Sequence, residues 1–462
     1  MLRALAATIL LFAAMAPAPA QEPAFRPAAG QGAYLVLTDI HFDPFAERDL
    51  VPKLAAAPIE DWPRILDSAA QKPSPFGRDT NHALLHSTLD AAAATGLAYD
   101  FVLIAGDFLA HDFQQKFAAT SGGSADYDGF VEKTMAFVSR AVQERFPQSP
   151  VIGTFGNNDS LCGDYGVSAS SRLFPFLAGQ WEVLRNDPVA AADFGIGGSY
   201  VLPHPTVPKQ RIVVVNDIYW SAKYRNCHPA GDDPGSAMLA WLEWQLFRIA
   251  EAGERATLLF HIPPGIDGYS SAYGRGGCVA ATTSFWRKAD EERFAAIVER
   301  YTGVLGPAIV GHTHMDEFRV MSSPAGTPLL AMKIFPAVSP IFGNAPAFTV
   351  VAYDRADGSL RDYAVFGLRN LVGPASQPAA VPDWRFEYSF GAAYGESVFD
   401  AATAVRLAAA IRTTPSVREA YTRFFPGIGA GTNAIRPTNW RTFACVQTEL
   451  RSAGYVACAC GG

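Results

Sequence analysis

Short apolar runs that end in glycine or polar residues recur along the chain and predict buried β-strands. Residues 101–105 (FVLIA) are the clearest run, and Gly106 and Asp107 follow them directly. Continuous apolar runs of this length are typical of strands that helices cover on both faces. Runs of the same kind cover residues 33–38, 151–155, 211–215, 257–260 and 307–310. Because ligand sites of open α/β sheets lie at the carboxyl ends of the strands, we expect the polar residues after these runs to share a site.

Helical patterns separate and follow these strands. Amphipathic periodicity and stop signals predict helices over residues 81–96, 127–146, 237–252, 401–412, 417–425 and 441–453. Residues 42–80, rich in Pro, Asp and Ala, are expected to form a long excursion between the first strand and the first helix. Alternation over residues 317–353 predicts antiparallel strands, and residues 371–383 predict a linker.

Composition indicates a globular protein with a large core. The chain has 462 residues, of which 49% are hydrophobic and 18% charged, enough for one large domain or two ordinary ones. The net charge of -7 and the lack of a basic stripe argue against a nucleic-acid partner.

The first 20 residues have the pattern of a secretory signal peptide. Arg3 supplies a positive start, residues 4–15 are apolar, and residues 18–20 (APA) form a small-residue cleavage signature. The run is shorter than the ~20 residues that a membrane span needs, and no other stretch is long enough, so no transmembrane segment is expected. We therefore expect a secreted or periplasmic protein whose mature chain begins at Gln21. Its six cysteines then favour disulfides, although their spacing leaves the pairing open.

The residues that follow the strands form a candidate metal centre. They are Asp39, His41, Asp107, Asn157, His261, His312 and His314. Carboxylate, amide and imidazole ligands in this mixture suit two divalent ions of intermediate hardness, and Asp107 is the natural bridge because a carboxylate can serve two cations. Two divalent ions and two aspartates leave a net positive charge. Such a site attracts anions, and phosphate esters are the expected class.

Two further patterns have less support. His82 and His86 lie four residues apart on a predicted helix, a spacing that can bind metal, but a solvated helix face is favoured because no helical glutamate accompanies them. Asp217 follows the strand over residues 211–215, yet it has no partner motif and is assigned no ligand role.

The combined motifs resemble the calcineurin-like metallophosphoesterase superfamily. The match rests on the pairs at 39/41, 106/107 and 156/157, on His261, and on Gly311-His312-x-His314. Residues 107–111, 261–265, 311–318 and 336–346 are similar to the acid sphingomyelinase and sphingomyelinase-like phosphodiesterase family. This resemblance covers most of residues 33–460.

The resemblance implies an α/β fold: a four-layer sandwich of two mixed β-sheets flanked by helices. It implies a catalytic domain over residues 30–370 and a helical, disulfide-containing subdomain over residues 384–462. It further implies two metal ions, with Zn²⁺ expected. One would be held by Asp39, His41, Asp107 and His314, and the other by Asp107, Asn157, His261 and His312. The expected reaction is hydrolysis of a phosphodiester by attack of a metal-bound hydroxide on phosphorus, with a histidine protonating the leaving group.

Two departures from the family pattern affect the expected activity. Asn158 stands where the superfamily usually has a histidine, and an amide can donate a hydrogen bond but cannot supply a proton. The acid role then falls on His111 or on water activated by Asp159, and a catalytically weakened metal- and phosphate-binding protein is the alternative. Only a short stretch separates the expected cleavage point from the first predicted strand, so we expect no saposin-like module before the catalytic region and favour a soluble phosphodiester or nucleotide over sphingomyelin in membranes. Hydrolysis of a choline-phosphate lipid stays the other alternative, and the protein is expected to be a monomer.

The resemblance also bears on cysteines and aromatic residues. It implies a disulfide between Cys227 and Cys278 and another from Cys445 to Cys458 or Cys460, and it leaves Cys162 unplaced. Trp384, Tyr388 and Tyr394 near the start of the C-terminal region either line the cleft or belong to the core, and a core position is favoured.

Overall fold

The computed structural model describes residues 25–69, 72–121, 126–227, 233–376 and 381–461. The predicted signal peptide lies outside these residues. A search of the described helices finds none that is long and apolar enough to cross a membrane.

The first of two large sheets has six strands in the order β14-β13-β12-β1-β2-β3. Strands β1, β2 and β3 are parallel, and the pairs from β1 outward to β14 are antiparallel. The strands are β1 (Gln31–Leu37), β2 (Val102–Ile104), β3 (Val151–Gly153), β12 (Ala347–Asp354), β13 (Leu360–Leu368) and β14 (Trp384–Ser389).

The second sheet has the order β10-β11-β9-β8-β6-β5. Its central strands β11, β9, β8 and β6 are parallel, and β10 and β5 pair antiparallel at the two edges. The strands are β5 (Tyr200–Pro203), β6 (Gln210–Val214), β8 (Arg255–Leu259), β9 (Ala308–Val310), β10 (Glu317–Ser322) and β11 (Pro328–Ile334). A separate short ladder joins β4 (Gly166–Val167) to β7 (Arg225–Asn226).

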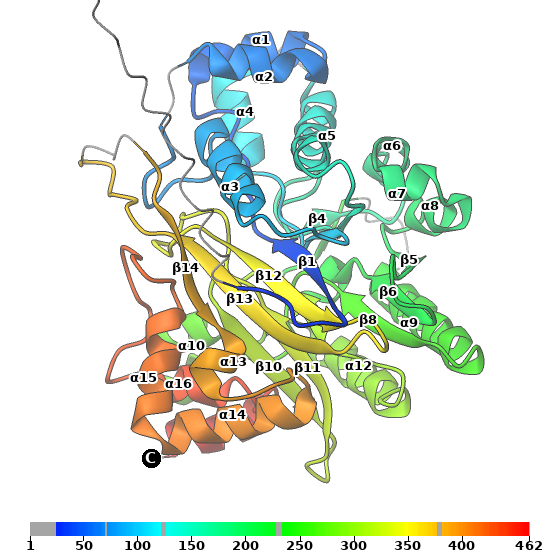
Figure 1. Ribbon diagram of the computed structural model, residues 1–462, viewed down its shortest axis with the longest axis vertical. Helices are drawn as coiled ribbons and strands as arrows, with labels where there is room; N and C mark the ends of the chain where they lie inside the picture. The colour runs from blue at the N-terminus through cyan, green and yellow to red at the C-terminus, as the bar shows by residue number, and fades with distance from the viewer. Residues whose placement is uncertain (1–24, 70–71, 122–125, 228–232, 377–380, 462) are drawn as a thin grey trace, which may run out of the picture.

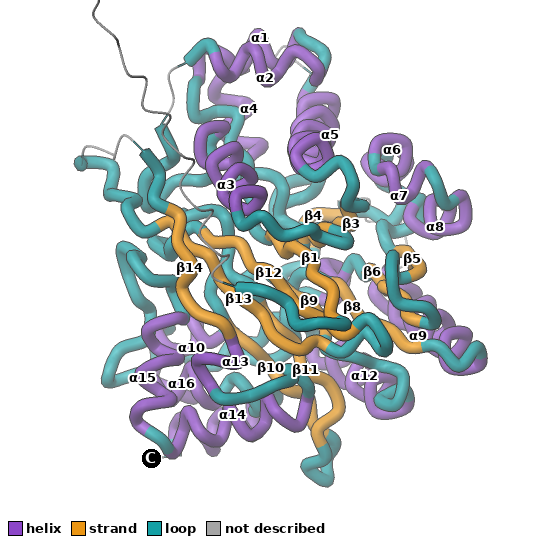
Figure 2. Tube along the Cα trace, in the orientation of Figure 1, coloured by secondary structure: helices purple, strands orange, loops and turns teal. Residues whose placement is uncertain are grey.

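Helices cover the two sheets (Figures 1 and 2). Helices α3 (His82–Ala94) and α5 (Tyr127–Arg145) contact the first sheet, and α9 (Pro234–Glu251), α12 (Lys288–Arg300) and α14 (Ala401–Thr413) contact the second. The predicted fold of two mixed sheets flanked by helices, with a helical C-terminal region, is confirmed. The other α-helices are α1 (Val51–Ala56), α2 (Trp62–Asp67), α4 (Phe113–Ser121), α6 (Leu173–Gln180), α7 (Glu182–Arg185), α8 (Pro188–Phe194), α10 (Gly268–Tyr273), α11 (Gly277–Ala280), α13 (Phe390–Tyr394), α15 (Pro415–Phe424), α16 (Trp440–Cys445) and α17 (Ser452–Tyr455).

The central strands are buried on both faces, which explains their continuous apolar runs. Every residue of β1 after the first is buried, and so is every residue of β2. Hydrogen bonds join the two sheets near the carboxyl ends of their strands. The Thr154 hydroxyl donates to the Val215 carbonyl at 3.0 Å, and the Tyr200 hydroxyl donates to the Gly153 carbonyl at 2.7 Å. The strand ends that carry the candidate ligands are therefore held in fixed relation to one another.

The predicted excursion over residues 42–80 contains the short helices α1 and α2. Each has a proline in its first turn, where the missing N–H group has no helical partner to lose. Their buried Trp62 and Leu66 attach this segment to the core. Because the segment is rich in proline and aspartate, the sequence analysis did not predict these two helices.

The C-terminal region begins with a strand, because β14 forms the outer edge of the first sheet. The helix expected over residues 441–453 is divided into α16 and α17. The division into two domains stays a prediction.

The disulfides are Cys162–Cys227, Cys278–Cys460 and Cys445–Cys458. The prediction of a Cys227–Cys278 bridge is wrong, and the prediction that Cys445 pairs with Cys458 or Cys460 is confirmed. Cys227 directly follows β7, whose ladder with β4 brings it to Cys162, whereas α11 carries Cys278 to the C-terminal turn over Val456–Cys460. The cysteine pairing is decided by which loops lie close together in the fold, and the spacing of the cysteines along the chain does not predict it.

Candidate metal centre

The candidate ligands project from the loops at the ends of β1, β2, β3, β8 and β9. Most of them adopt an unusual backbone conformation, since φ is 47° at Asp39, 44° at His41, 54° at Asp107, 78° at His312 and 63° at His314. Residues other than glycine rarely adopt positive φ. Such strain costs ~1–3 kcal/mol per residue and is concentrated at functional sites. Its recurrence at five candidate ligands indicates that the loops are shaped to aim side chains at one point.

Two glycines let these loops approach one another. A Cβ atom at Gly106 would lie 2.7 Å from both the Gly156 nitrogen and His261 Nδ1. At Gly311 a Cβ atom would lie 2.8 Å from Asp39 Oδ2. Any larger residue at either position would push the candidate ligands apart.

One group of donor atoms comes from Asp39, His41, Asp107 and His314. His41 Nε2 lies 3.1 Å from His314 Nε2 and 3.3 Å from Asp107 Oδ2. Asp39 Oδ1 lies 3.4 Å from His314 Nε2 and 3.8 Å from His41 Nε2. All four residues are buried. These separations suit four ligands around one cation.

A second group comes from Asp107, Asn157, His261 and His312. His261 Nε2 lies 3.2 Å from Asp107 Oδ2 and 3.2 Å from Asn157 Oδ1. His312 Nδ1 lies 2.8 Å from the same Asn157 oxygen. Asp107 therefore stands between the two groups, as the bridging role requires.

The histidine tautomers fit bound cations. His41 Nδ1 lies 2.8 Å from the Leu109 carbonyl and His261 Nδ1 lies 2.7 Å from the Ala105 carbonyl, so each Nδ1–H donates to the backbone. The Nε2 lone pairs then face the Asp107 carboxylate. Lone pairs directed at a carboxylate repel it unless a cation lies between them, and backbone-oriented histidines are typical of metal ligands. The donor set therefore fits divalent metal ions.

The pKa values of His261, Asp107 and Asp39 indicate that the centre of the cluster favours positive charge, whereas burial lowers the pKa of His41 to about 4 and the pKa values of His312 and His314 well below the usual range. Burial lowers the pKa of His261, but the charge and hydrogen bond of Asp107 outweigh burial and raise it to about 10. Burial alone would raise the pKa of Asp107, yet the charges of His261 and His41 hold it well below its usual range. Burial raises the pKa of Asp39 to about 6. The cluster stabilises a cation at its centre, either a proton or a metal ion.

His111, the predicted acid, lies beside the first donor group. Its ring stacks on that of His41 with centroids 4.0 Å apart, and one of its nitrogens lies within 4.8 Å of those of His41 and His314. His111 Nδ1 is 2.9 Å from Asp79 Oδ1. Burial lowers the pKa of His111, but the hydrogen bond and charge of Asp79 produce a net increase. No sequence motif pointed to Asp79, which lies in the excursion over residues 42–80.

Asn158 and Asp159 support the loops. The Asn158 backbone N–H donates to Asp107 Oδ1 at 2.8 Å, and its side-chain Nδ2 donates to Oδ2 at 3.0 Å. Asp159 is buried and accepts hydrogen bonds from the backbone N–H groups of Phe108, Leu109 and Gly156. Both Asp159 oxygens are thus occupied, which leaves His111 as the better placed acid.

Asp217 has a role that sequence reasoning missed. Its buried carboxylate accepts hydrogen bonds from the backbone N–H groups of His261 at 3.0 Å and Ile262 at 2.8 Å, and so it fixes the turn that carries His261. The strand pattern before Asp217 was visible, but its partners are backbone atoms, which no motif reveals.

The histidine pair on α3 is only partly as predicted. His86 is exposed, but His82 is buried and lies 3.0 Å from Asp67 Oδ1, so the expected solvated face is wrong for His82. Because His82 faces inward onto α5, its ring also lies 6.0 Å from Phe137.

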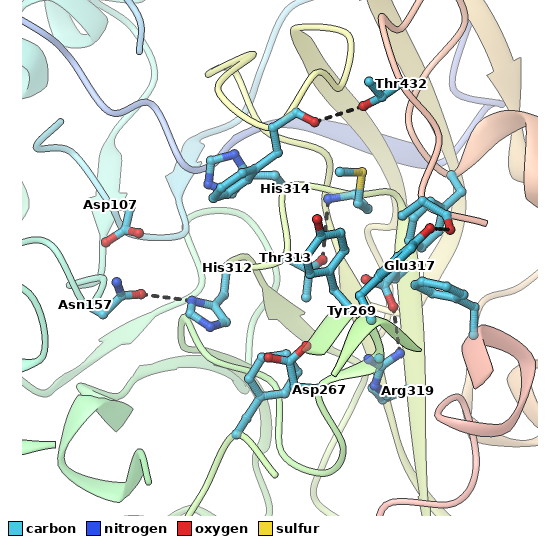
Figure 3. Close-up of a pocket in the computed structure, with 18 of the residues that line it drawn as sticks. Asp107, Asn157, Asp267, Tyr269, His312, Thr313, His314, Glu317, Arg319 and Thr432 are labelled. Atoms are coloured by element: carbon cyan, nitrogen blue, oxygen red, sulfur yellow. Dashed lines mark hydrogen bonds and ion pairs between the residues drawn. The ribbon is translucent and has the colours of Figure 1, made fainter. Parts of the chain in front are cut away.

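A cavity of about 570 Å³ opens onto the metal centre (Figure 3). It extends from Asp107, Asn157 and His312 toward the Glu317–Arg319 ion pair and the C-terminal segment at Thr432. Aromatic side chains of Tyr269, Tyr273 and Phe342 line it and are 62%, 49% and 52% exposed.

Trp384, Tyr388 and Tyr394 are absent from the described lining of this cavity. Tyr388 is buried and donates to Asp316 Oδ2 at 2.6 Å. The Trp384 indole N–H donates to the Ser87 hydroxyl at 2.7 Å. The ring of Tyr394 lies 5.8 Å from that of Phe390 and 6.3 Å from that of Tyr388. These contacts agree with the favoured interpretation of the three residues as packing residues.

Comparisons with known proteins agree with the geometry. The profile of the calcineurin-like phosphoesterase family matches residues 33–316. Acid sphingomyelinase-like phosphodiesterase 3b of Homo sapiens is 27% identical over 377 residues, which cover 79% of this chain and 76% of the relative. Cyclic GMP-AMP phosphodiesterase SMPDL3A of Rattus norvegicus is 26% identical over 384 residues, covering 80% and 78%. Sphingomyelinase phosphodiesterase D of Dictyostelium discoideum is 25% identical over 328 residues, covering 69% and 66%.

Proposed function

This chain belongs to the calcineurin-like phosphoesterase family, and on that premise we propose that it is an exported phosphodiesterase with two Zn²⁺ ions. As a member of this family it is a phosphoric ester hydrolase. The observation that carries the proposal is the convergence of donor atoms from five strand ends on Asp107, whose Oδ2 lies 3.3 Å from His41 Nε2 and 3.2 Å from His261 Nε2.

We assign one metal ion to Asp39, His41, Asp107 and His314, and the other to Asp107, Asn157, His261 and His312. When bound, two such ions activate water and stabilise the negative charge that develops on the phosphoryl group. The protein must hold these ligands in place, and the hydrogen bonds from Asn158 to Asp107 and from the His261 turn to Asp217 support that role.

His111 is the proposed general acid. Asp79 orients its ring through Nδ1 and raises its pKa, so that the other ring nitrogen can carry a proton. The ring lines the cavity beside His314, where a leaving oxygen would depart. Proton donation to an alkoxide leaving group is the step that this position supports.

A weakened metal- and phosphate-binding protein is the alternative that Asn158 raises. The hydrogen bonds of Asn158 to both Asp107 oxygens favour the active enzyme, because Asn158 then has the role of holding a proposed ligand in place. His111 lies on the other donor group and supplies the acid that an amide lacks.

We propose a soluble phosphodiester, such as a nucleotide-type diester, as the substrate. Its support is the cavity, whose volume of about 570 Å³ lies within the ~300–1,000 Å³ of typical small-molecule sites. Thr432, Asn433 and Ala434 of the C-terminal segment line it beyond the metal centre. Relatives named for cyclic GMP-AMP and for sphingomyelin make both a nucleotide and a choline-phosphate lipid necessary members of any substrate panel.

Export is supported by the three disulfides, which form and persist in oxidising compartments. The mass of the mature protein tests the expected start at Gln21, and its sedimentation tests the expected monomer.

The test of the function is hydrolysis of bis(p-nitrophenyl) phosphate by the purified protein. We expect turnover that a chelator abolishes and Zn²⁺ restores, and loss of that turnover in Asp107→Ala. Wild-type protein that contains zinc but releases no nitrophenolate would support the weakened alternative. Faster hydrolysis of sphingomyelin in detergent-free vesicles than of a soluble nucleotide diester would replace the proposed substrate class with a lipid.

A further inference from the structure

Besides His111, the described residues that line the cavity include one lysine and two arginines, and these three side chains have different partners. Arg319 is buried and forms an ion pair with Glu317 at 2.8 Å. Lys223 and Arg436 are exposed, and within the described residues neither has a carboxylate at ion-pair distance. Of these two exposed cations, Lys223 covers the ring of Tyr165, which in turn lies beside His312.

Lys223 stands on the His312 side of the centre. Its Nζ lies 5.2 Å from the centroid of the Tyr165 ring, and that ring lies 6.4 Å from the ring of His312. The Tyr165 backbone N–H donates to the Asn157 carbonyl at 2.8 Å. Lys223 therefore lies on the side of the cavity that carries Asn157 and His312, two candidate ligands of the second metal ion.

The backbone around Lys223 is firmly held. The Ala222 N–H donates to the Phe285 carbonyl at 2.8 Å, and the Lys223 N–H donates to the Ser221 hydroxyl at 3.1 Å. The Arg225 N–H donates to the Tyr165 carbonyl at 2.9 Å, and the Cys162–Cys227 disulfide closes the segment. A fixed backbone that presents an exposed ammonium to a cavity is suited to binding a ligand.

Two carboxylates of the cavity have hydrogen-bond partners other than Lys223, although the charge of Lys223 acts to lower the pKa of Asp164, which burial raises. Asp164 and Asp267 line the same cavity. Asp164 accepts a hydrogen bond from Asn157 Nδ2 at 2.7 Å, and Asp267 caps α10 by accepting from Ser270. Lys223 also covers a face of Tyr165, the kind of surface on which a quaternary ammonium group would otherwise bind.

We propose that Lys223 is a substrate-binding residue that favours phosphodiesters with an additional negative charge on the retained alcohol and disfavours those with a choline cation. This inference rests on the proposed function and narrows its substrate class. An ammonium near the second metal ion attracts an anionic substituent and repels a cationic one. The preference should weaken as salt screens the exposed charge.

The test uses three p-nitrophenyl phosphodiesters whose second alcohol is glycolate, ethanol or choline. All three release the same nitrophenolate, so they differ only in the charge of the retained group. In the zinc-loaded wild-type enzyme we expect kcat/KM to fall in the order glycolate, ethanol, choline. In Lys223→Met we expect the glycolate ester to lose ~10-fold in kcat/KM, mainly through KM, with the ethyl ester nearly unchanged and the choline ester unchanged or improved.

Two controls accompany this variant. Lys288→Met removes one positive charge from a side chain that is 88% exposed and absent from the described cavity lining, and it should leave all three rates unchanged. Lys223→Arg keeps the charge and should retain most of the preference for glycolate. Metal content and thermal unfolding of each variant report whether the centre is intact.

The outcomes separate this inference from the proposed function. Equal losses on all three esters in Lys223→Met, or no loss on any, would overturn the role of Lys223 while the enzyme remains a phosphodiesterase. Absence of turnover of every ester by the zinc-loaded wild type would instead contradict the proposed function.

Discussion

Asn158→Ala should weaken metal binding while leaving turnover at saturating metal close to that of the wild type. The substitution removes the side-chain hydrogen bond from Nδ2 to Asp107 Oδ2, which is 3.0 Å long, and keeps the backbone hydrogen bond to Oδ1. The carboxylate then retains one anchor and gains freedom to rotate away from the position between the two donor groups.

The magnitude follows from the kind of bond that is lost. A hydrogen bond to a charged group contributes ~1.5–3 kcal/mol. Loss of a group that orients a metal ligand typically lowers metal affinity ~10–100-fold, which corresponds to about 1.4–2.8 kcal/mol. The two estimates agree, so we expect a ~10–100-fold weaker zinc affinity and a kcat within about threefold of the wild type.

Competition with a chromophoric chelator measures the affinity, and hydrolysis of bis(p-nitrophenyl) phosphate at saturating zinc measures kcat. Asn81→Ala is the matched control, because Asn81 is also buried and accepts from the Leu84 N–H at the start of α3. That variant should lose stability but keep its zinc affinity. Unchanged zinc affinity with a large fall in kcat for Asn158→Ala would refute the positioning role and indicate direct contact with phosphate.

Substitutions at three further residues test other proposed roles. His111→Ala should lower kcat/KM ~10²–10⁴-fold for an alkyl leaving group and much less for nitrophenolate, and equal losses on both would mean that His111 only positions the phosphate. Asp217→Ala leaves two buried backbone N–H groups unpaired and should lower the free energy of unfolding, measured by thermal unfolding, by ~2–6 kcal/mol. Asp217→Asn should have an intermediate effect, and wild-type stability in Asp217→Ala would contradict the role of Asp217 at the His261 turn. Burial raises the pKa of Glu387 from 4.5 to about 8, so the stability of the wild type should fall as pH rises from about 4.5 to 8. Glu387→Gln should then be the more stable protein above about pH 8, by at most ~5 kcal/mol, with little difference below pH 4.5; a difference independent of pH in chemical denaturation would contradict the assignment.

The strand ends were predictable because their signal is local. Each candidate ligand directly follows an apolar run, so position along the chain was enough to predict Asp39, Asp107 and His261 as neighbours. The apolar runs predicted the individual strands, whereas their arrangement in two mixed sheets was implied by the family resemblance alone.

The supporting residues could not be predicted because their roles depend on contacts between distant segments. Asp79 orients His111 from 32 positions away along the chain, and Asp217 holds a turn 44 positions away. The role proposed for Lys223 depends on a disulfide and a short ladder that bring its loop beside Tyr165.

The disulfide prediction failed for the same reason. Cys227 and Cys278 belong to different loops, and the fold takes one to Cys162 and the other to Cys460. The strand β14 was also missed, because its aromatic and charged residues are half-buried at a sheet edge and its pairing with β13 is set by the fold.

The central claim is that two zinc ions share Asp107 and that hydrolysis needs both. Its most direct test is a zinc titration of the metal-free protein in which bound zinc and phosphodiester hydrolysis are measured at each step. Two ligand groups that share Asp107 predict two zinc ions per chain in the wild type and activity that appears only as the second ion binds. Asp107→Ala should retain neither the second ion nor the activity. Full activity with one zinc ion per chain, or two tightly bound ions in Asp107→Ala, would contradict the account.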